Sequence, residues 1–406
     1  MIKKIFAKDK LYIRVAIGFA IGILLGILLP EFSIAAKPVG DIYLKILKLF
    51  ITPIVFCAVF CAFANIKDGK LLRQIGLRTV ALYVLMFVVS SVISLGIAFV
   101  IRPGLSTSFA NAPVYEGTTT SATVGSFFMN LLPKKFDDIL YGSKTLLIII
   151  VSIVFALVCL KLGEKAAKVI GGMNKLSAFF FKLLLWFMEL SPIGVASLMA
   201  FSVAQYGSGI FGSLAKYIAC CWICCIAVYV LVMLLPAVLI TKVPAKDFLK
   251  ASGKIALVTL STTSSAATLP TTIRVSTEEL GAPEDVSNFT LPLGCTINMC
   301  GGACSFCCLA VFVSDFYSLS LSLGTIVLLI ALATIINMAA PGIPGGGIIL
   351  GASFLSLLGM PIDLMGPISG FYRLLDMAFT TMNVEGDVSA NLLIAKSVGK
   401  YLNSKA

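Results

Sequence analysis

The sequence predicts an all-α polytopic membrane protein, and two observations lead to that prediction. The chain has 406 residues, of which 59% are hydrophobic and only 12% are charged, and its mean hydropathy is +1.04. Soluble domains carry about 25% charged residues, so this chain is too apolar for a soluble fold. Its apolar residues also form repeated runs of about 20, the length that an α-helix needs to cross the hydrocarbon core of a bilayer.

The runs can be followed in order along the chain. The first starts after "MIKKIFAKDK", whose lysines favour a cytoplasmic N-terminus, and it lacks a small-residue cleavage site, so we expect a retained helix rather than a signal peptide. Other lysines gather in loops and tails, so the net charge of +12 indicates membrane orientation and not nucleic-acid binding. The eight runs are residues 11–29, 42–64, 79–101, 145–162, 175–204, 214–240, 291–313 and 319–340.

The twelve cysteines could be packing residues or metal ligands. Cys300, Cys304 and Cys307 have the spacing of a three-cysteine iron–sulfur site, and residues 220–225 read "CCWICC". These cysteines interrupt apolar helical runs rather than loops, and free cysteine packs there as a small hydrophobe. The chain has no histidine, so the usual mixed zinc sites are excluded. We therefore expect packing, with no iron–sulfur cluster and no organic cofactor.

From residue 250 onward, polar and Gly/Pro stretches interrupt the apolar segments at positions that should lie within the membrane. They are residues 261–272, 294–303, 339–347 and 373–387. Irregular backbone at membrane depth is tolerated only where protein or a water-filled cavity covers it, so we expect the four stretches to share one cavity.

The order of these interruptions suggests an internal duplication. A re-entrant hairpin with a polar tip is followed by a polar-interrupted helix twice, at residues 250–275 with 288–313 and at 321–360 with 364–396. Paired interruptions in two halves of a chain are the best sequence indication of a transporter's binding site.

The last interruption, "RLLDMAFTTMNVEGD", places polar groups on one face of a helix. At 100° per residue, Asp376, Thr380, Asn383 and Asp387 lie within one 60° sector. An ion pair between Arg373 and Asp376 is one explanation, but it does not account for the two deeper residues. Oxygen ligands of this kind suit a hard cation such as sodium.

These segments resemble the dicarboxylate/amino acid:cation symporter family, the glutamate transporter homologues, over nearly the whole chain. The segments that carry the resemblance are "LKLFITPIVFCAVF", "NLLPKKFDDIL", "FMELSPIGV", "SSAATLP", "LPLGCTINM", "GIPGGG" and "LDMAFTTMNVEGD". The resemblance implies a fold of eight transmembrane helices plus two re-entrant helical hairpins. It also implies a homotrimer in a bacterial inner membrane, with both termini cytoplasmic and a transport domain that moves like an elevator past a scaffold. By domain, it implies scaffold helices 1 and 2 in residues 1–70, helix 3 of the transport domain in 71–103, scaffold helices 4 and 5 with helix 6 in 104–240, and the transport core in 241–406.

The resemblance also implies site residues. It places the substrate's ammonium group at Asp376 and its carboxylate at Asn383. The full substrate set is Asp376, Phe379, Thr380, Asn383, Ser265, Gly342 and Ile343. The sodium set is Asp387, Asn298, Gly294, Asn383, Thr296 and Met338.

Phe379 departs from the family pattern, because acidic-substrate members carry there the arginine that binds a side-chain carboxylate. A phenyl ring cannot neutralise a buried carboxylate, and Thr263 stands where some members hold another arginine. Arg373 could replace that cation, although it lies two turns from Asn383. We therefore expect a neutral site, with Phe379 either restricting it to small substrates, stacking on a larger apolar side chain or only packing against the first hairpin.

Two further departures concern ions. Cys300 replaces an aspartate that helps to bind an additional sodium in the family, and Val88 and Val89 align with its other ligands, with Ser90 and Ser91 one step away. This indicates a degenerate third ion site. Glu385 stands on the face opposite Asn383, and it is either paired with a neighbouring group or a carrier of coupled protons.

The function expected from these residues is sodium-coupled symport of small neutral amino acids such as serine, threonine or alanine. The alternative is proton- or sodium-coupled symport of acidic amino acids or dicarboxylates. A membrane iron–sulfur redox protein is the alternative from another class. Enzymatic chemistry is not expected, because no pair of nucleophile and base is visible.

Overall fold

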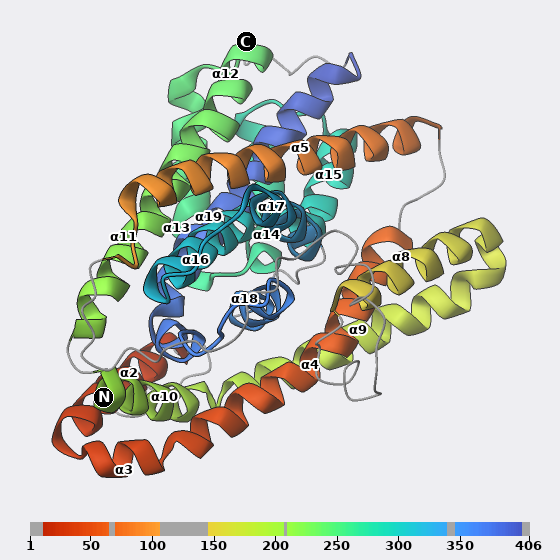
Figure 1. Cartoon of the computed structure of the whole chain (residues 1–406). Helices are drawn as coiled ribbons and strands as arrows, with labels where there is room; N and C mark the ends of the chain where they lie inside the picture. Colours follow the sequence, from red (N-terminus) through yellow and green to blue (C-terminus); the bar gives the residue numbers. More distant parts are fainter. Residues whose placement is uncertain (1–10, 65–69, 106–144, 207–208, 339–345, 400–406) are drawn as a thin grey trace, which may run out of the picture.

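The computed structural model describes residues 11–64, 70–105, 145–206, 209–338 and 346–399, and every regular element within these residues is helical (Figure 1). In chain order the helices are α2 (Leu11–Leu28), α3 (Pro30–Ala35), α4 (Lys37–Ala64), α5 (Lys70–Ile101), α8 (Thr145–Leu162), η2 (Gly163–Ala166), α9 (Ala167–Met188), α10 (Ser191–Tyr206), α11 (Gly209–Val228), η3 (Tyr229–Leu234), α12 (Leu235–Thr241), α13 (Ala245–Thr262), α14 (Ser265–Arg274), η4 (Val275–Glu279), α15 (Glu284–Ile297), α16 (Cys300–Phe316), α17 (Leu323–Met338), α18 (Gly346–Leu357) and α19 (Met365–Ser397). The all-α prediction is confirmed.

Three stretches of the described residues are long and apolar enough, by length and composition, to cross a membrane. They are Ile75–Ile101, Gly212–Thr241 and Glu284–Phe316. The count of eight membrane helices stays a prediction.

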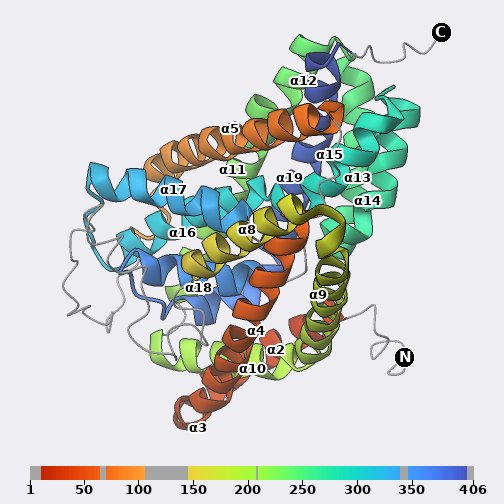
Figure 2. The ribbon, with the colours of Figure 1, turned by 90° about the vertical axis from the view of Figure 1, so that its right-hand side faces the viewer.

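The N-terminal helices pack closely because small residues line their contact. α10 packs against α2, α3 and α4, and α4 packs against α8 and α9 (Figures 1 and 2). Gly18, Gly22 and Gly26 recur one turn apart on α2, and a Cβ on any of them would collide with α10. Small residues at this spacing let two helix backbones approach within a membrane.

The single span predicted for residues 175–204 is wrong. The structure has two helices there, α9 and α10, separated by a turn at Glu189 and Leu190. Glu189 forms an ion pair with Arg14 of α2, with 2.6 Å between Nη1 and Oε2. Pro192 lies in the first turn of α10, where its missing N–H costs least. A charged residue followed by a helix-starting proline thus ends one helix and begins another.

The run predicted at residues 214–240 is helical throughout, but its middle is a π-helical segment, η3. Pro236 follows within the first turn of α12. Proline has no N–H to donate to the preceding turn, which explains why the helix widens here. Such single-turn π segments are common at functional positions, and Tyr229 of η3 takes part in a polar contact described below.

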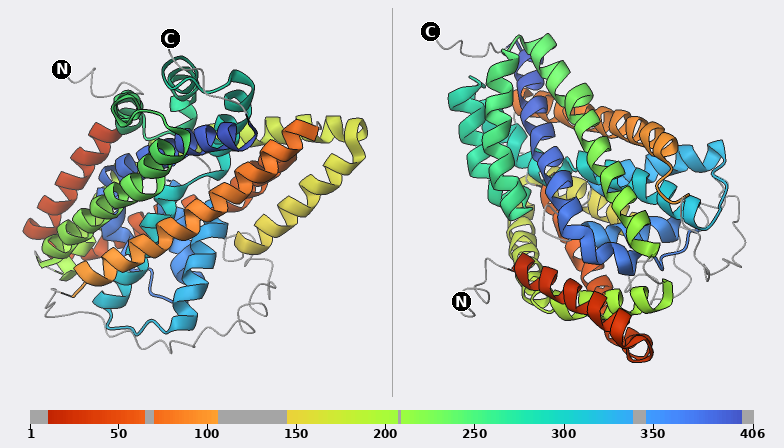
Figure 3. Two further views of the ribbon diagram at one scale, coloured as in Figure 1. Left: turned by 90° about the horizontal axis from the view of Figure 1, so that it is seen from above. Right: turned by 90° about the vertical axis from the view of Figure 1, so that its left-hand side faces the viewer.

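α19 lies at the centre of the second group of helices. It packs against α11, α13, α15, α16 and α18, while α5 crosses the outside of α11, α15, α16 and α17 (Figure 3). In the right-hand view of Figure 3, α19 runs beside α11. The polar residues of α19 are therefore enclosed by other helices.

Candidate functional site

Two helical interruptions lie where the sequence predicts them. α13 ends at Thr262 and α14 begins at Ser265, and Thr263 between them has a left-handed backbone with φ of 47°. The side chain of Ser264 caps α14 by accepting from the N–H of Ala267 at 3.2 Å.

The second interruption separates α15 from α16 at Asn298 and Met299. Both residues are buried. The prediction of irregular backbone within residues 294–303 is confirmed.

The other two predicted interruptions turn out differently. α17 ends at Met338 and α18 begins at Gly346, and the segment between them, with Gly342 and Ile343, lies outside the described residues. Residues 373–387 belong to one regular helix, α19, so the prediction of a fourth interruption is wrong. The polar residues there occupy one face of the helix and leave its backbone hydrogen bonds intact, which is why no break is needed.

The polar stripe of α19 faces the interruption between α15 and α16. Asn383 accepts the N–H of Gly301 with Oδ1 at 2.8 Å, and its Nδ2 lies 3.1 Å from the sulfur of Met299. Asp387 accepts the side-chain amide of Asn298 with Oδ1 at 2.8 Å. The first turn of α16 and the deeper half of the stripe are therefore held together by buried hydrogen bonds.

Glycines make this close approach possible. A Cβ on Gly294 would collide with the carboxylate of Asp387 and with the hydroxyl of Tyr83, and a Cβ on Gly301 would collide with the backbone of Phe379. Asp387, Asn298 and Gly294 thus lie together, and their role as sodium ligands stays a prediction. Carboxylate, amide and carbonyl oxygens are the ligands that a hard cation prefers.

The residues of the α19 polar stripe that lie nearer the N-terminus of the helix, Asp376 and Thr380, are also buried. Thr380 lies one turn from Asp376, with 3.4 Å between its Oγ1 and Oδ1 of Asp376. Ser265 begins α14 and is buried, and within the described part of the chain its hydroxyl has no hydrogen-bond partner.

Arg373 reaches the tip of the first hairpin, as it must if it replaces the missing cation. Its guanidinium donates to the hydroxyl of Thr263, at the tip of the α13–α14 hairpin. α19 thus brings a cation to the position where Thr263 replaces an arginine, which favours the alternative that Arg373 replaces the missing cation over the expected neutral site. Phe379 is 2% exposed and its ring centre lies 6.5 Å from that of Tyr372, so it packs within α19 and the core.

Thr296 and Met338, the remaining predicted sodium ligands, stay predictions. Thr296 is exposed and donates to the carbonyl of Leu293 at 2.7 Å. Met338 ends α17, next to residues that lie outside the described part of the chain.

The sequence placed Cys300, Val88 and Val89 together as a degenerate ion site. Cys300 donates to the side-chain oxygen of Asn298 at 2.8 Å. Val88 and Val89 are exposed, whereas Ser90 and Ser91 on the same helix are fully buried. The choice of the valines is therefore wrong by one step along α5, because the buried face carries the serines.

Glu385 lies on the opposite face of α19, against α13. Its Oε2 accepts the hydroxyl of Ser252 at 2.7 Å, and Ser252 in turn accepts the hydroxyl of Tyr229 at 2.8 Å. Further along the same two helices, Thr259 and Thr381 share a hydrogen bond of 2.7 Å. Three polar contacts, including that of Arg373 with Thr263, therefore fix α13 to α19.

Two residues of this site were not predicted from the sequence. Tyr83 donates to the carbonyl of Thr290 at 3.1 Å and lies beside Gly294. The side-chain oxygen of Asn337 lies against Gly302. A single phenol in the apolar run of α5, and an amide at the end of α17, were the available signals.

Interrupted helices that meet around buried carboxylates are the arrangement of secondary transporters. Residues 11–397 match the sodium:dicarboxylate symporter family, and the chain belongs to that family. It is 28% identical to the C4-dicarboxylate transport protein of Solibacter usitatus (strain Ellin6076), over 97% of this chain and 93% of the relative.

Two other relatives extend the comparison. The C4-dicarboxylate transport protein of Janthinobacterium sp. (strain Marseille) is 30% identical, over 96% of this chain and 90% of the relative. The proton/sodium-glutamate symport protein of Bacillus subtilis (strain 168) is 24% identical, over 93% and 89%. These names do not support the neutral amino acid branch, and they favour the acidic-substrate alternative.

Proposed function

We propose that the protein is a cation-coupled symporter of the bacterial inner membrane that carries a small substrate with two carboxylates. The observation that supports this proposal is the bond between Arg373 and Thr263. A guanidinium at the hairpin tip can bind a carboxylate with two parallel hydrogen bonds, and it removes the penalty of burying a second negative charge.

Asp376 refines the substrate class. It is buried one turn from Arg373, and it matches the residue that takes an ammonium group in the family that the motifs resemble. A carboxylate and a guanidinium side by side complement an acidic amino acid such as aspartate better than a plain dicarboxylate such as succinate. Asn383 would then bind the second carboxylate of the substrate.

Sodium is the proposed coupling ion, bound as a co-transported substrate. Asp387 would supply a carboxylate oxygen, and the backbone carbonyls of Asn298 and Gly294, which the resemblance assigns to this site, would supply further oxygens. The contact between Asn298 and Asp387 and the closeness of Gly294 to Asp387 support this proposal. A proton is the alternative coupling ion, and buried Glu385 is then its carrier.

A symporter of neutral amino acids is the second candidate, because Phe379 stands at the position of the family's carboxylate-binding arginine. The packing of Phe379 near Tyr372 weakens this candidate. A ring held by the protein core has less direct influence on selectivity than a ring that faces the substrate.

We also propose the family's architecture for this chain. α2, α4 and α8–α10 would form the scaffold of a homotrimer, and α13–α19 together with α5 would form the moving transport core, with both termini cytoplasmic. The packing of α5 on α16 supports its place in the core.

Uptake by proteoliposomes tests the substrate. Labelled aspartate is driven inward by a sodium gradient at equal pH, with excess succinate, serine or glutamate as competitors. The expected result is saturable aspartate uptake that glutamate competes for strongly, succinate weakly and serine hardly at all. Serine uptake that aspartate leaves unchanged would refute the acidic substrate in favour of the second candidate.

Arg373→Gln tests the residue, with Arg274→Gln as the matched control. Arg274 lies exposed at the end of α14, the same hairpin whose tip Arg373 contacts. Losing a charge-assisted hydrogen bond costs about 1.5–3 kcal/mol, so Arg373→Gln should raise the KM for aspartate about 10–100-fold, and Arg274→Gln should not. An equal effect of the two changes would contradict the role of Arg373.

A further inference from the structure

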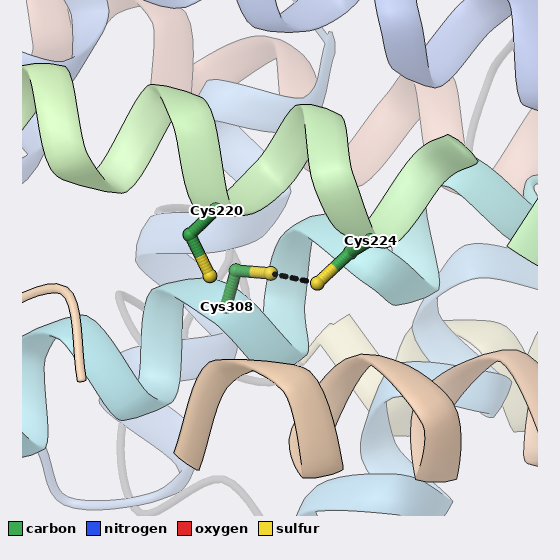
Figure 4. Close-up of side chains that lie close together, drawn as sticks. All are labelled: Cys220, Cys224 and Cys308. Atoms are coloured by element: carbon green, nitrogen blue, oxygen red, sulfur yellow. Dashed lines mark hydrogen bonds between the residues drawn. The ribbon is translucent and has the colours of Figure 1, made fainter. Parts of the chain in front are cut away.

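Three buried cysteines meet between two helices outside the proposed transport site. Cys220 and Cys224 lie one turn apart on α11, and Cys308 of α16 lies between them (Figure 4). The three sulfur atoms all lie within 4.8 Å of one another. The sulfurs of Cys308 and Cys224 lie 3.4 Å apart.

We propose that these three thiols bind one monovalent soft metal ion, copper(I). Thiolate sulfur is the ligand that selects Cu(I) among the metals available to proteins. Zinc usually takes four ligands in a structural site, whereas three thiols in the described part of the chain have sulfurs that all lie within 4.8 Å of one another. A three-sulfur site therefore suits Cu(I) better than zinc.

All three cysteines are buried, with at most 1% exposure. Cysteine binds a metal as the thiolate, so each thiol that binds Cu(I) gives up its proton as the metal enters.

The surroundings protect a reduced ion. Tyr217 of α11 and Phe312 of α16 stack on the same interface, with ring centres 4.7 Å apart. The sulfur of Cys224 also donates weakly to the carbonyl of Ser94 on α5, at 3.7 Å. Since no water reaches the thiols from the surface, Cu(I) must enter while the helices assemble or open.

The test is copper content after expression in copper-supplemented cells and purification of the full chain under anaerobic reducing conditions. Wild type is compared with a variant that carries Cys220→Ser, Cys224→Ser and Cys308→Ser. The matched control carries the same change at three cysteines of α4 and α8, which are Cys57, Cys61 and Cys159. We expect one copper per chain in wild type and control, and none in the cluster variant.

A second measurement keeps the proposal falsifiable where the cluster variant does not fold. X-ray absorption at the copper edge of wild type should show three sulfur neighbours and no nitrogen or oxygen. The single change Cys308→Ser should weaken Cu(I) affinity at least about 100-fold in competition with a chromophoric chelator, because even a lost outer-shell partner costs about 10–100-fold. Copper-free wild type, copper with two sulfur neighbours, or loss of copper only in the control would each overturn the site.

Discussion

Replacing Gly301 by alanine should separate α16 from α19. A Cβ at this position would lie 2.6 Å from the Cα and 2.7 Å from the carbonyl carbon of Phe379. These are backbone atoms, so no side-chain rotation relieves the collision and the helices must move apart. Overpacking costs about 1–3 kcal/mol, and the strained hydrogen bond from Gly301 to Asn383 adds about 0.5–1.5 kcal/mol.

The free energy of unfolding should therefore fall by about 2–4 kcal/mol, measured by denaturant titration of the purified protein in mixed micelles. Substrate uptake should fall by more than the loss of folded protein accounts for, because moving the helices apart also displaces Asn383. Gly96→Ala on α5 is the matched control, since no described atom lies within 4 Å of its added Cβ. That change should stabilise the helix by about 0.5–1 kcal/mol. A Gly301→Ala variant as stable as the control variant would refute the close packing of α16 on α19.

Two other changes test the ions. Asn298→Ala removes the amide that donates to Asp387. It should raise the sodium concentration that gives half-maximal uptake about tenfold or more. An unchanged sodium dependence would exclude Asp387 from the ion site. Glu385→Gln keeps a hydrogen-bonding group beside Ser252, so stability should change little, while any uptake driven by a proton gradient should disappear. Glu279→Gln on the exposed part of the first hairpin is its control, and proton-driven uptake that survives Glu385→Gln would exclude this carrier.

Much of the architecture could be predicted from local sequence. The apolar runs predicted the all-α fold class, and the polar interruptions predicted the helix breaks near Thr263 and Asn298. Both predictions depend only on residues that are close together in the chain. The turn between α9 and α10 was missed, since its partner Arg14 lies far away in the sequence. Helix periodicity cannot show a pairing of this kind.

The site was harder to predict than the fold. The stripe on α19 followed from helical geometry, but the reach of Arg373 to Thr263 depends on how the first hairpin packs on α19. The choice between Val88 and Ser90 depended on a rotation of α5 that only the neighbouring helices determine. Helix spacing thus identified the polar residues of α19, whereas the rotation of α5 and the position of the first hairpin depend on contacts between helices.

The three polar contacts between α13 and α19 determine which parts of the site can open. They occur at separate levels along the two antiparallel helices, at Ser252 with Glu385, Thr259 with Thr381 and Thr263 with Arg373. Sliding α13 along α19 would break all three at once, so this hairpin and α19 should move as one rigid body. Access for the substrate must then alternate through the other hairpin or through displacement of the whole unit. A crosslink from α13 to α19 should consequently leave transport intact.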